Sequence, residues 1–223
     1  MRKMLTSITN DPAPGEWEFN GIRGRGIAPP RCAGNFKGLA VVMATGWSVW
    51  TDLQAFDPVE NKAEVIAVNN MILHWKGRVH HGVSLHAEEP PLWRKLRQQY
   101  GCDNSHVTCH AYRESRDPQV MNCDYIWPMV GCCLAGTSSL LAVAVGLALG
   151  YDRIVVAGVP LDDKGHFYDP PGTVTKLFAG SPRREWETAN ELWFQDRVRS
   201  LSGWTGEYLG GPTKEWLDGA AKR

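Results

Sequence analysis

The sequence PLDDKGHFYD follows an apolar run and combines several side chains that can exchange protons. Histidine has the unperturbed pKa closest to neutral pH, and a neighbouring carboxylate can fix its tautomer. We therefore expect His166 to act as a general acid or base, with Asp162 or Asp163 beside it. Asp169 is a second-rank candidate. The alternative is that the two aspartates form a solvated turn that only precedes the histidine.

Small, hydroxyl-bearing and amide side chains follow three apolar runs, in the sequences ATGWS, VNN and AGTSS. Glycine allows a close backbone approach, amides and hydroxyls can bind base, ribose or phosphate, and a helix N-terminus attracts anions. Each loop also has a structural interpretation, as a strand-to-helix turn, an Asx turn or an N-cap. The predicted nucleotide-binding residues are Gly46, Ser48, Asn69, Asn70, Gly136, Thr137, Ser138 and Ser139.

Four potential zinc ligands lie close together in the chain: Cys102, His106, Cys109 and His110. They are too crowded for the usual paired arrangement, and a strand at residues 107–111 would send alternate side chains to opposite faces. We therefore predict a mixed core and surface role for them and no metal site. The six cysteines in 223 residues do not suggest a disulfide framework, so we expect reduced thiols.

Short apolar runs alternate with helical segments after residue 38, which is typical of β-α repeats and a mostly parallel sheet. Thr137 or Ser138 can cap the clearest helix, and Gly150 can end it. In such a sheet the polar loops meet at the carboxyl edge, where His86 and Glu88 are further second-rank candidates. The predicted strands are 39–43, 64–68, 82–86, 107–111, 153–159 and 197–200, and the predicted helices are 91–100, 138–150 and 182–196.

The composition is that of a folded globular protein, with 43% apolar and 22% charged residues and a formal net charge of zero. The net charge gives no general attraction to nucleic acid or to an acidic membrane. The longest apolar run, residues 140–149, is too short to cross a bilayer, and we expect a cytoplasmic protein. We predict an irregular N-terminal extension at 1–37. Residues 38–223 should form one Rossmann-like α/β domain, a three-layer sandwich that includes the C-terminal tail.

The segments ATGWS, EVIAVNN, GTSS and LGYDRIVVAGVPLDDKGHF, in this order, resemble a Rossmann-like group of families. The group includes the DUF115 proteins, related to pterin diphosphokinases, and the bacterial family-42 sialyltransferases. The closing stretch RVRSLSGWTGEYLGGPTKEWL is similar to uncharacterised phage and prophage proteins. The resemblance implies binding of a CMP-sugar or ATP, with Gly46, Ser48, Asn69, Thr137 and Ser138 on the matching loops. The role of His166 is assigned from its own chemistry.

The leading hypothesis is a nucleotide-sugar-dependent glycosyltransferase that acts on a hydroxyl acceptor and has no tightly bound cofactor. It would work in the cytoplasm, or in the host cytoplasm if a phage encodes it. One alternative is an ATP-dependent diphosphokinase of the pterin type, with magnesium on carboxylates such as Asp162, Asp163 or Asp169. Another is a non-catalytic phage binding or assembly protein with the same fold. The sequence leaves the acceptor, the need for magnesium and homo-oligomerisation open.

Overall fold

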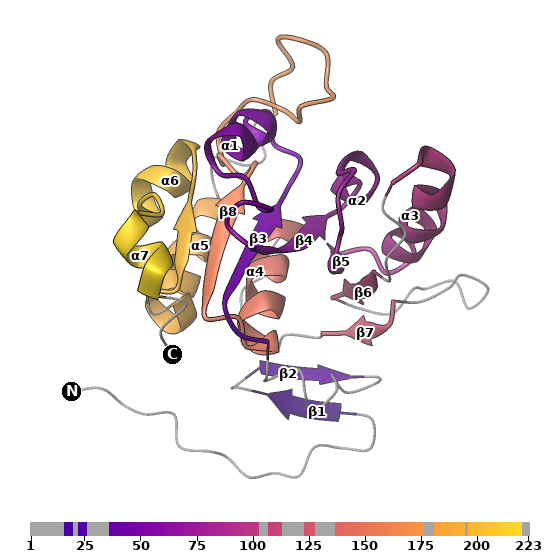
Figure 1. Ribbon diagram of the computed structural model, residues 1–223, viewed down its shortest axis with the longest axis horizontal. Helices are drawn as coiled ribbons and strands as arrows, with labels where there is room; N and C mark the ends of the chain where they lie inside the picture. Colours follow the sequence, from indigo (N-terminus) through magenta and orange to yellow (C-terminus); the bar gives the residue numbers. More distant parts are fainter. Residues whose placement is uncertain are drawn as a thin grey trace.

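Seven parallel strands form the centre of one nine-stranded sheet in the computed structural model of the protein (Figure 1). The structure describes residues 16–19, 22–25, 36–102, 107–112, 123–127, 137–175, 181–194 and 196–219. The elements in chain order are β1 (Glu16–Phe19), β2 (Ile22–Arg25), β3 (Leu39–Met43), α1 (Val49–Ala55), β4 (Glu64–Val68), α2 (Met71–His74), β5 (His81–Ser84), α3 (Glu89–Arg97), η2 (Gln98–Tyr100), β6 (Thr108–Ala111), β7 (Tyr125–Ile126), α4 (Ser138–Leu149), β8 (Arg153–Ala157), α5 (Ser181–Ala189), η3 (Asn190–Phe194), β9 (Val198–Ser200), α6 (Gly203–Leu209) and α7 (Lys214–Asp218).

The strand order is β1-β2-β7-β6-β5-β4-β3-β8-β9. From β3 the chain moves outward through β4, β5, β6 and β7, each parallel to its neighbour. It then returns through α4 to β8, which pairs with β3 on the opposite side, and β9 completes the parallel part. The direction of strand addition therefore reverses between β3 and β8. This architecture confirms the predicted Rossmann-like α/β sandwich.

Helices cover both faces of the sheet, and strand residues alternate between the two cores. Along β3, Ala40 and Val42 pack in the core that contains α4, whereas Val41 and Met43 pack in the core that contains α1 and α2. All four side chains are fully buried. This alternation follows from the two-residue period of a strand, and the continuous apolar sequence reflects burial on both faces.

The helix α4 has the termini that the sequence predicts. The Thr137 side chain accepts a hydrogen bond from the Leu140 N–H, and Gly150 ends the helix with φ of 104°. Every residue of α4 is buried, which agrees with a helix that is apolar on all sides. Among the described residues, no helix has the length and apolar character needed to cross a membrane.

Two strands end earlier than their apolar runs predict. The chain leaves β5 at Ser84, because the Leu85 N–H donates to the Ser138 hydroxyl at 3.1 Å rather than to a neighbouring strand. His86 consequently lies in the loop after β5. β8 ends at Ala157, because the next residue, Gly158, has φ of 70°, which a strand does not accommodate.

The segment 1–37, expected to be irregular, contains the hairpin strands β1 and β2. They pair antiparallel with Phe19 opposite Ile22, and β2 continues the sheet by pairing antiparallel with β7. The intervening sequence is Asn20-Gly21, a dipeptide strongly preferred in two-residue hairpin loops. The hairpin signal was therefore present in a segment whose glycine and arginine content suggested a loop.

A chain of buried polar side chains lies between the sheet and α4, well away from the strand-end loops. The Trp127 indole N–H donates to His110 Nδ1 at 3.0 Å, and His110 Nε2 lies 3.1 Å from His81 Nδ1. His81 Nε2 lies 3.1 Å from the Tyr151 hydroxyl, which donates to Glu64. Because an indole N–H only donates and a carboxylate only accepts, neutral histidines with protonated Nε2 satisfy every link.

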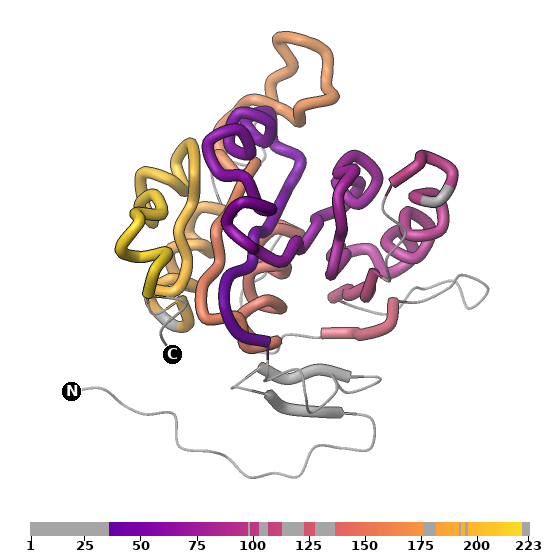
Figure 2. The backbone as a smooth tube through the Cα atoms, in the orientation of Figure 1, coloured from indigo at the N-terminus to yellow at the C-terminus, as the bar shows by residue number. Residues whose placement is uncertain are grey.

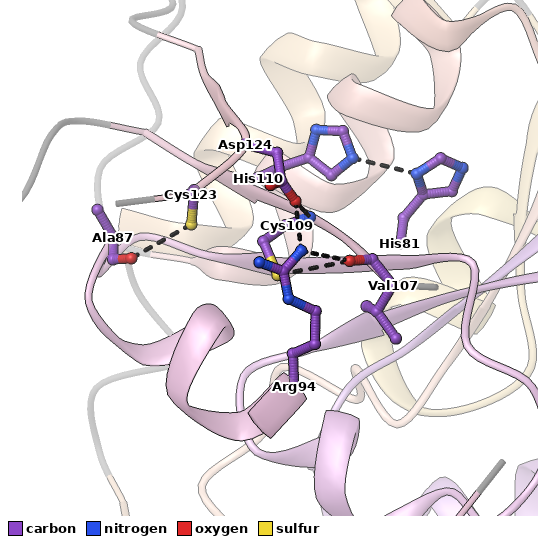
Figure 3. A network of polar contacts seen from close by, with 8 residues as sticks. All are labelled: His81, Ala87, Arg94, Val107, Cys109, His110, Cys123 and Asp124. Atoms are coloured by element: carbon purple, nitrogen blue, oxygen red, sulfur yellow. Dashed lines mark hydrogen bonds and ion pairs between the residues drawn. The ribbon is translucent and has the colours of Figure 1, made fainter. Parts of the chain in front are cut away.

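A second polar cluster ties α3 to the outer strands (Figure 3). Arg94 donates to the Asp124 carboxylate at 2.7 Å and to the Val107 carbonyl at 2.8 Å. The Cys109 N–H donates to the same Asp124 carboxylate. Burial raises the pKa of the Cys109 thiol to about 12, and it also raises the pKa of Cys123. Both thiols are therefore protonated and unreactive at neutral pH.

Candidate functional site

A cavity of about 230 Å³ lies at the carboxyl edge of the sheet, where strand addition reverses between β3 and β8. Its walls come from the loops that follow β3, β4, β5 and β8 and from the N-terminus of α4. Open α/β sheets bind ligands at this topological position, because diverging loops leave a crevice there. The predicted residues that line it are Gly46, Asn69, Thr137, Ser138, Ser139, His86, Asp162 and His166.

Two glycines allow the loops after β3 and β8 to lie against each other. The Gly46 N–H donates to the Gly158 carbonyl at 2.9 Å. A Cβ atom on Gly46 would lie 2.5 Å from that carbonyl oxygen, and one on Gly158 would lie 2.6 Å from the Ala44 oxygen. Both distances are shorter than the contacts that real Cβ atoms make with atoms to which they are not bonded. The predicted close backbone approach at Gly46 is thus present, and it is an approach to another loop of the protein.

Ser48 lies outside the cavity lining and belongs to a buried network that fastens three loops together. The Asp52 carboxylate accepts hydrogen bonds from the Gly158 N–H at 2.7 Å, the Ser202 hydroxyl at 2.8 Å and the Ser48 hydroxyl at 3.1 Å. The Ser202 oxygen also lies 2.8 Å from the Ser48 oxygen, so its single hydroxyl proton is shared between Ser48 and Asp52. This burial explains why the Ser48 hydroxyl does not face the cavity. Asp52 and Ser202 support the loops that do.

Asn69 lines the cavity in a left-handed conformation, with φ of 52°. Its side-chain oxygen Oδ1 is buried and has no hydrogen-bond partner among the described residues. An unpaired buried carbonyl oxygen costs about 1–3 kcal/mol and points to a missing donor. Asn70 occupies the N-cap position of α2 without a capping hydrogen bond, and it is not among the described residues that line the cavity.

The N-terminus of α4 presents three hydroxyl-bearing residues to the cavity, and two of them also have structural roles. Thr137 caps the helix, and Ser138 accepts the Leu85 N–H. Ser139 lines the cavity beside them. The amide groups of the first turn carry the positive end of the helix dipole, so this wall favours a negatively charged group. Gly136, also predicted for this loop, lies outside the described residues.

His166 is held next to the first loop and is paired with a carboxylate. The Phe167 N–H donates to the Thr45 carbonyl at 3.0 Å, which places the histidine beside Gly46. The ring nitrogen Nδ1 lies 3.2 Å from Asp169 Oδ2, and the His166 N–H donates to the same oxygen at 2.6 Å. These contacts, the backbone one first, lower the pKa of Asp169. The carboxylate bonded to the ring is therefore the second-rank candidate Asp169.

Asp162 and Asp163 have other surroundings. Asp162 lines the cavity, but its carboxylate accepts the Trp47 indole N–H at 3.0 Å. Asp163 lies on the far side of the loop, next to an adjoining hollow. Lys164, between the two sites, lines the cavity and holds its Nζ 4.0 Å above the Trp47 ring centre. It supplies a positive charge that we did not predict for the site.

Leu161 is a second missed residue of the cavity wall. Its backbone is left-handed, with φ of 48°, which is unusual for a leucine. Arg183 from α5 donates to the Leu161 carbonyl through Nε at 2.9 Å and through Nη2 at 2.7 Å. This clamp holds the loop after β8 in a conformation that the chain would rarely adopt. Since Arg183 follows 22 positions later, no local sequence signal reveals the contact.

The remaining predicted candidates are spread over other parts of the molecule. Glu88 is exposed and is not among the described residues that line the cavity. Cys102 and Cys109 are buried thiols, and His110 belongs to the buried polar chain. His106 lies outside the described residues. Among the residues that are described, no three histidine, cysteine, aspartate or glutamate side chains are grouped as metal ligands.

Comparison of the chain with family models, with curated proteins and with solved structures gives no match. The functional conclusion therefore depends on the geometry of the cavity. That geometry combines an anion-attracting helix start, an unpaired amide oxygen, a lysine and a histidine with its own carboxylate.

Proposed function

We propose that the cavity binds a nucleotide-activated sugar and that the protein transfers the sugar to an acceptor hydroxyl. The main support for this proposal is that polar loops from distant parts of the chain meet at one cavity. Segments as far apart as residues 46, 69, 137–139 and 166 line one cavity at the point where strand addition reverses. The segments at 69, 137–139 and 166 each contribute a group that suits one part of such a donor, and Gly46 holds two of the loops together. The predicted resemblance to nucleotide-binding Rossmann-like families agrees with this assignment.

The donor would be held mainly through its phosphates. The first turn of α4 offers N–H donors, and Lys164 lines the cavity and adds a positive charge nearby, with its Nζ over the Trp47 ring outside the cavity lining. The unpaired Asn69 Oδ1 would accept a hydrogen bond from a base or ribose. At 230 Å³ the cavity is below the roughly 300–1,000 Å³ of sites for drug-sized ligands. We therefore expect it to enclose the phosphates and one flanking unit, with the rest of the donor outside.

In the reaction, His166 would act as the general base. Asp169 accepts a hydrogen bond from Nδ1–H, so Nε2 carries the lone pair that would remove the proton from the acceptor hydroxyl. The acceptor oxygen then bonds to the anomeric carbon, and the bond from that carbon to the phosphate oxygen breaks. The phosphate leaves with the electron pair, and its charge is stabilised by the α4 amides and Lys164.

The direct test is ligand-induced stabilisation of the purified protein by CMP, UDP, GDP, ADP and their sugar derivatives. A nucleotide at 100 times its Kd should raise the free energy of unfolding by about 2.7 kcal/mol. If none of these ligands raises the melting temperature, the proposal is wrong. Stabilisation by ATP alone, and only with Mg²⁺, would instead favour diphosphate transfer.

The His166→Ala variant then tests the chemical role. We expect it to bind the stabilising nucleotide sugar as the wild type does, and to lose at least about 100-fold in the rate of transfer or donor hydrolysis. Arg78→Ala is the control, because Arg78 is an exposed residue that does not line the cavity. Full activity of His166→Ala would remove the assigned role.

A further inference from the structure

A second hollow, of about 400 Å³, adjoins the cavity and shares three lining residues with it. Lys164, Gly165 and His166 line both spaces, which adjoin at these residues. Trp47 lies on one side of the hollow, and the loop of residues 163–174 lies on the other. A ligand in the hollow and a ligand in the cavity would therefore both contact His166.

Hydrogen bonds give the loop that borders the hollow a defined shape. Lys164 and Val174 are bridged as in an antiparallel hairpin, and the Thr175 N–H donates to the Asp163 carbonyl at 2.7 Å. At the tip, the Thr173 N–H donates to the Pro170 carbonyl at 3.1 Å. The loop follows β8 and precedes α5 in the chain, and it projects from the body of the molecule (Figure 2). The hollow is thus bounded by a hairpin-like segment whose two arms are joined by hydrogen bonds.

The walls of the hollow combine a fixed aromatic ring with carboxylates. The Trp47 indole is 40% exposed, although Lys164 covers it at 4.0 Å and Asp162 accepts its N–H. The carboxylates of Asp163 and Asp169 lie along the same hollow. A pyranose ring has apolar C–H faces and a rim of hydroxyl donors. It matches an aromatic surface flanked by carboxylate acceptors.

We infer that this hollow is the acceptor subsite and that it binds a saccharide, one of whose hydroxyls reaches His166. The inference rests on the proposed function, because it assigns the second substrate of the same reaction. It adds the chemical class of the acceptor and a residue, Trp47, that binds it. Because His166 lines both spaces, a donor in the cavity and an acceptor in the hollow would reach the same base.

The test is saturation-transfer NMR on nucleotide-free protein with methyl glycosides of galactose, glucose and N-acetylglucosamine as probes. We expect transfer to at least one of them, and an approximately tenfold weaker affinity in Trp47→Ala. Trp47→Phe, which keeps an aromatic face, should retain most of the binding. Tyr100→Ala is the matched control, since Tyr100 is also exposed and has a lysine, Lys76, over its ring.

The outcomes separate this inference from the proposed function, because no nucleotide is present. Absence of binding by all three glycosides, or equal affinity in wild type and a folded Trp47→Ala, overturns the acceptor subsite. A thermal melt of each variant establishes that it is folded. Failure of the nucleotide screen with Trp47-dependent glycoside binding would overturn the donor assignment and leave a saccharide-binding site.

Discussion

His166 and the buried pair His81 and His110 have opposite surroundings. The side chain of His166 is 31% exposed at the carboxyl edge of the sheet, where it contacts Asp169 and lines a cavity. His81 and His110 are buried, and they belong to a hydrogen-bonded chain that begins at Trp127 and continues to Tyr151. Each link of that chain joins a donor to an acceptor. His166 lines a cavity that a ligand can enter, whereas the two buried histidines are enclosed by the protein.

Among the described histidines, the strongly shifted pKa values belong to the buried pair. Burial lowers the pKa of His81 to about 3, and it lowers the pKa of His110 well below its ordinary value. Neither is among the described residues that line the cavity. A perturbed pKa is often used to locate functional sites, but here it reflects burial. Exposure to a cavity marks the functional region better, and the unpaired Asn69 oxygen is informative because Asn69 lines that cavity, whereas the equally unpaired Asn70 Oδ1 lies outside its described lining.

The largest expected effect is acid destabilisation through the buried pair. Because both histidines have folded-state pKa values below 6.5, the unfolded chain binds more protons than the folded chain below that pH. Stability is therefore complete above pH 6.5 and is lost as the pH falls towards the folded pKa. Between pH 6.5 and 4.5, protonation of His81 alone should remove about 2 kcal/mol from the free energy of unfolding, and His110 should add to the loss in the same direction. Urea denaturation at several pH values measures this loss.

The variant His81→Gln sharpens this test, because glutamine cannot take up the proton. Its free energy of unfolding should be lower than that of the wild type at pH 7, but it should fall by about 2 kcal/mol less on acidification to pH 4.5. If wild type and variant lose the same amount over this range, then His81 is not the buried neutral group described above.

The next largest effect should come from disturbing the contact between the loops after β3 and β8, which line the cavity. In Gly46→Ala the new Cβ would lie 2.5 Å from the Gly158 oxygen and 2.7 Å from Pro160 Cδ, so the two loops must separate. We expect a loss of about 2 kcal/mol in the free energy of unfolding and a loss of nucleotide-dependent stabilisation. Gly211→Ala is the control, because a Cβ there meets nothing within 4 Å. Unchanged ligand stabilisation in Gly46→Ala would mean that the cavity does not depend on this contact.

The sequence predicts the sheet well because the relevant signals are local. The apolar runs at residues 39–43 and 64–68 have the bounds of β3 and β4. Thr137 and Gly150 mark the ends of α4 by simple capping rules. The short helix α2 and the two-residue strand β7 were missed, because their few residues do not develop a periodic pattern. Their conformation depends on packing against the rest of the chain.

For the candidate site, the sequence predicts which loops meet but not how every side chain is used. The carboxyl ends of parallel strands share an edge, and this rule alone brings Asn69 and His166 to one cavity. The contacts of Ser48 could not be predicted, since Ser202, one of its partners, lies 154 positions away. The ring of His166 pairs with Asp169 because a turn brings residues three positions apart together. Such contacts depend on the loop conformation.

The smallest expected effect comes from a variant that keeps the backbone conformation of Asn69 and removes its side-chain amide. Its φ of 52° suits glycine, so Asn69→Gly should change the free energy of unfolding by no more than about 1 kcal/mol. The variant removes the unpaired Oδ1, and we expect about tenfold weaker nucleotide binding by calorimetry, or about 1.4 kcal/mol. Asn70→Gly, on the adjacent residue outside the described cavity lining, should bind as the wild type does. Equal weakening in both variants would show that the loop conformation matters and the Asn69 amide does not. The cavity would then owe its affinity to the α4 amides and Lys164, and an unpaired oxygen would be no better guide to function here than a shifted pKa.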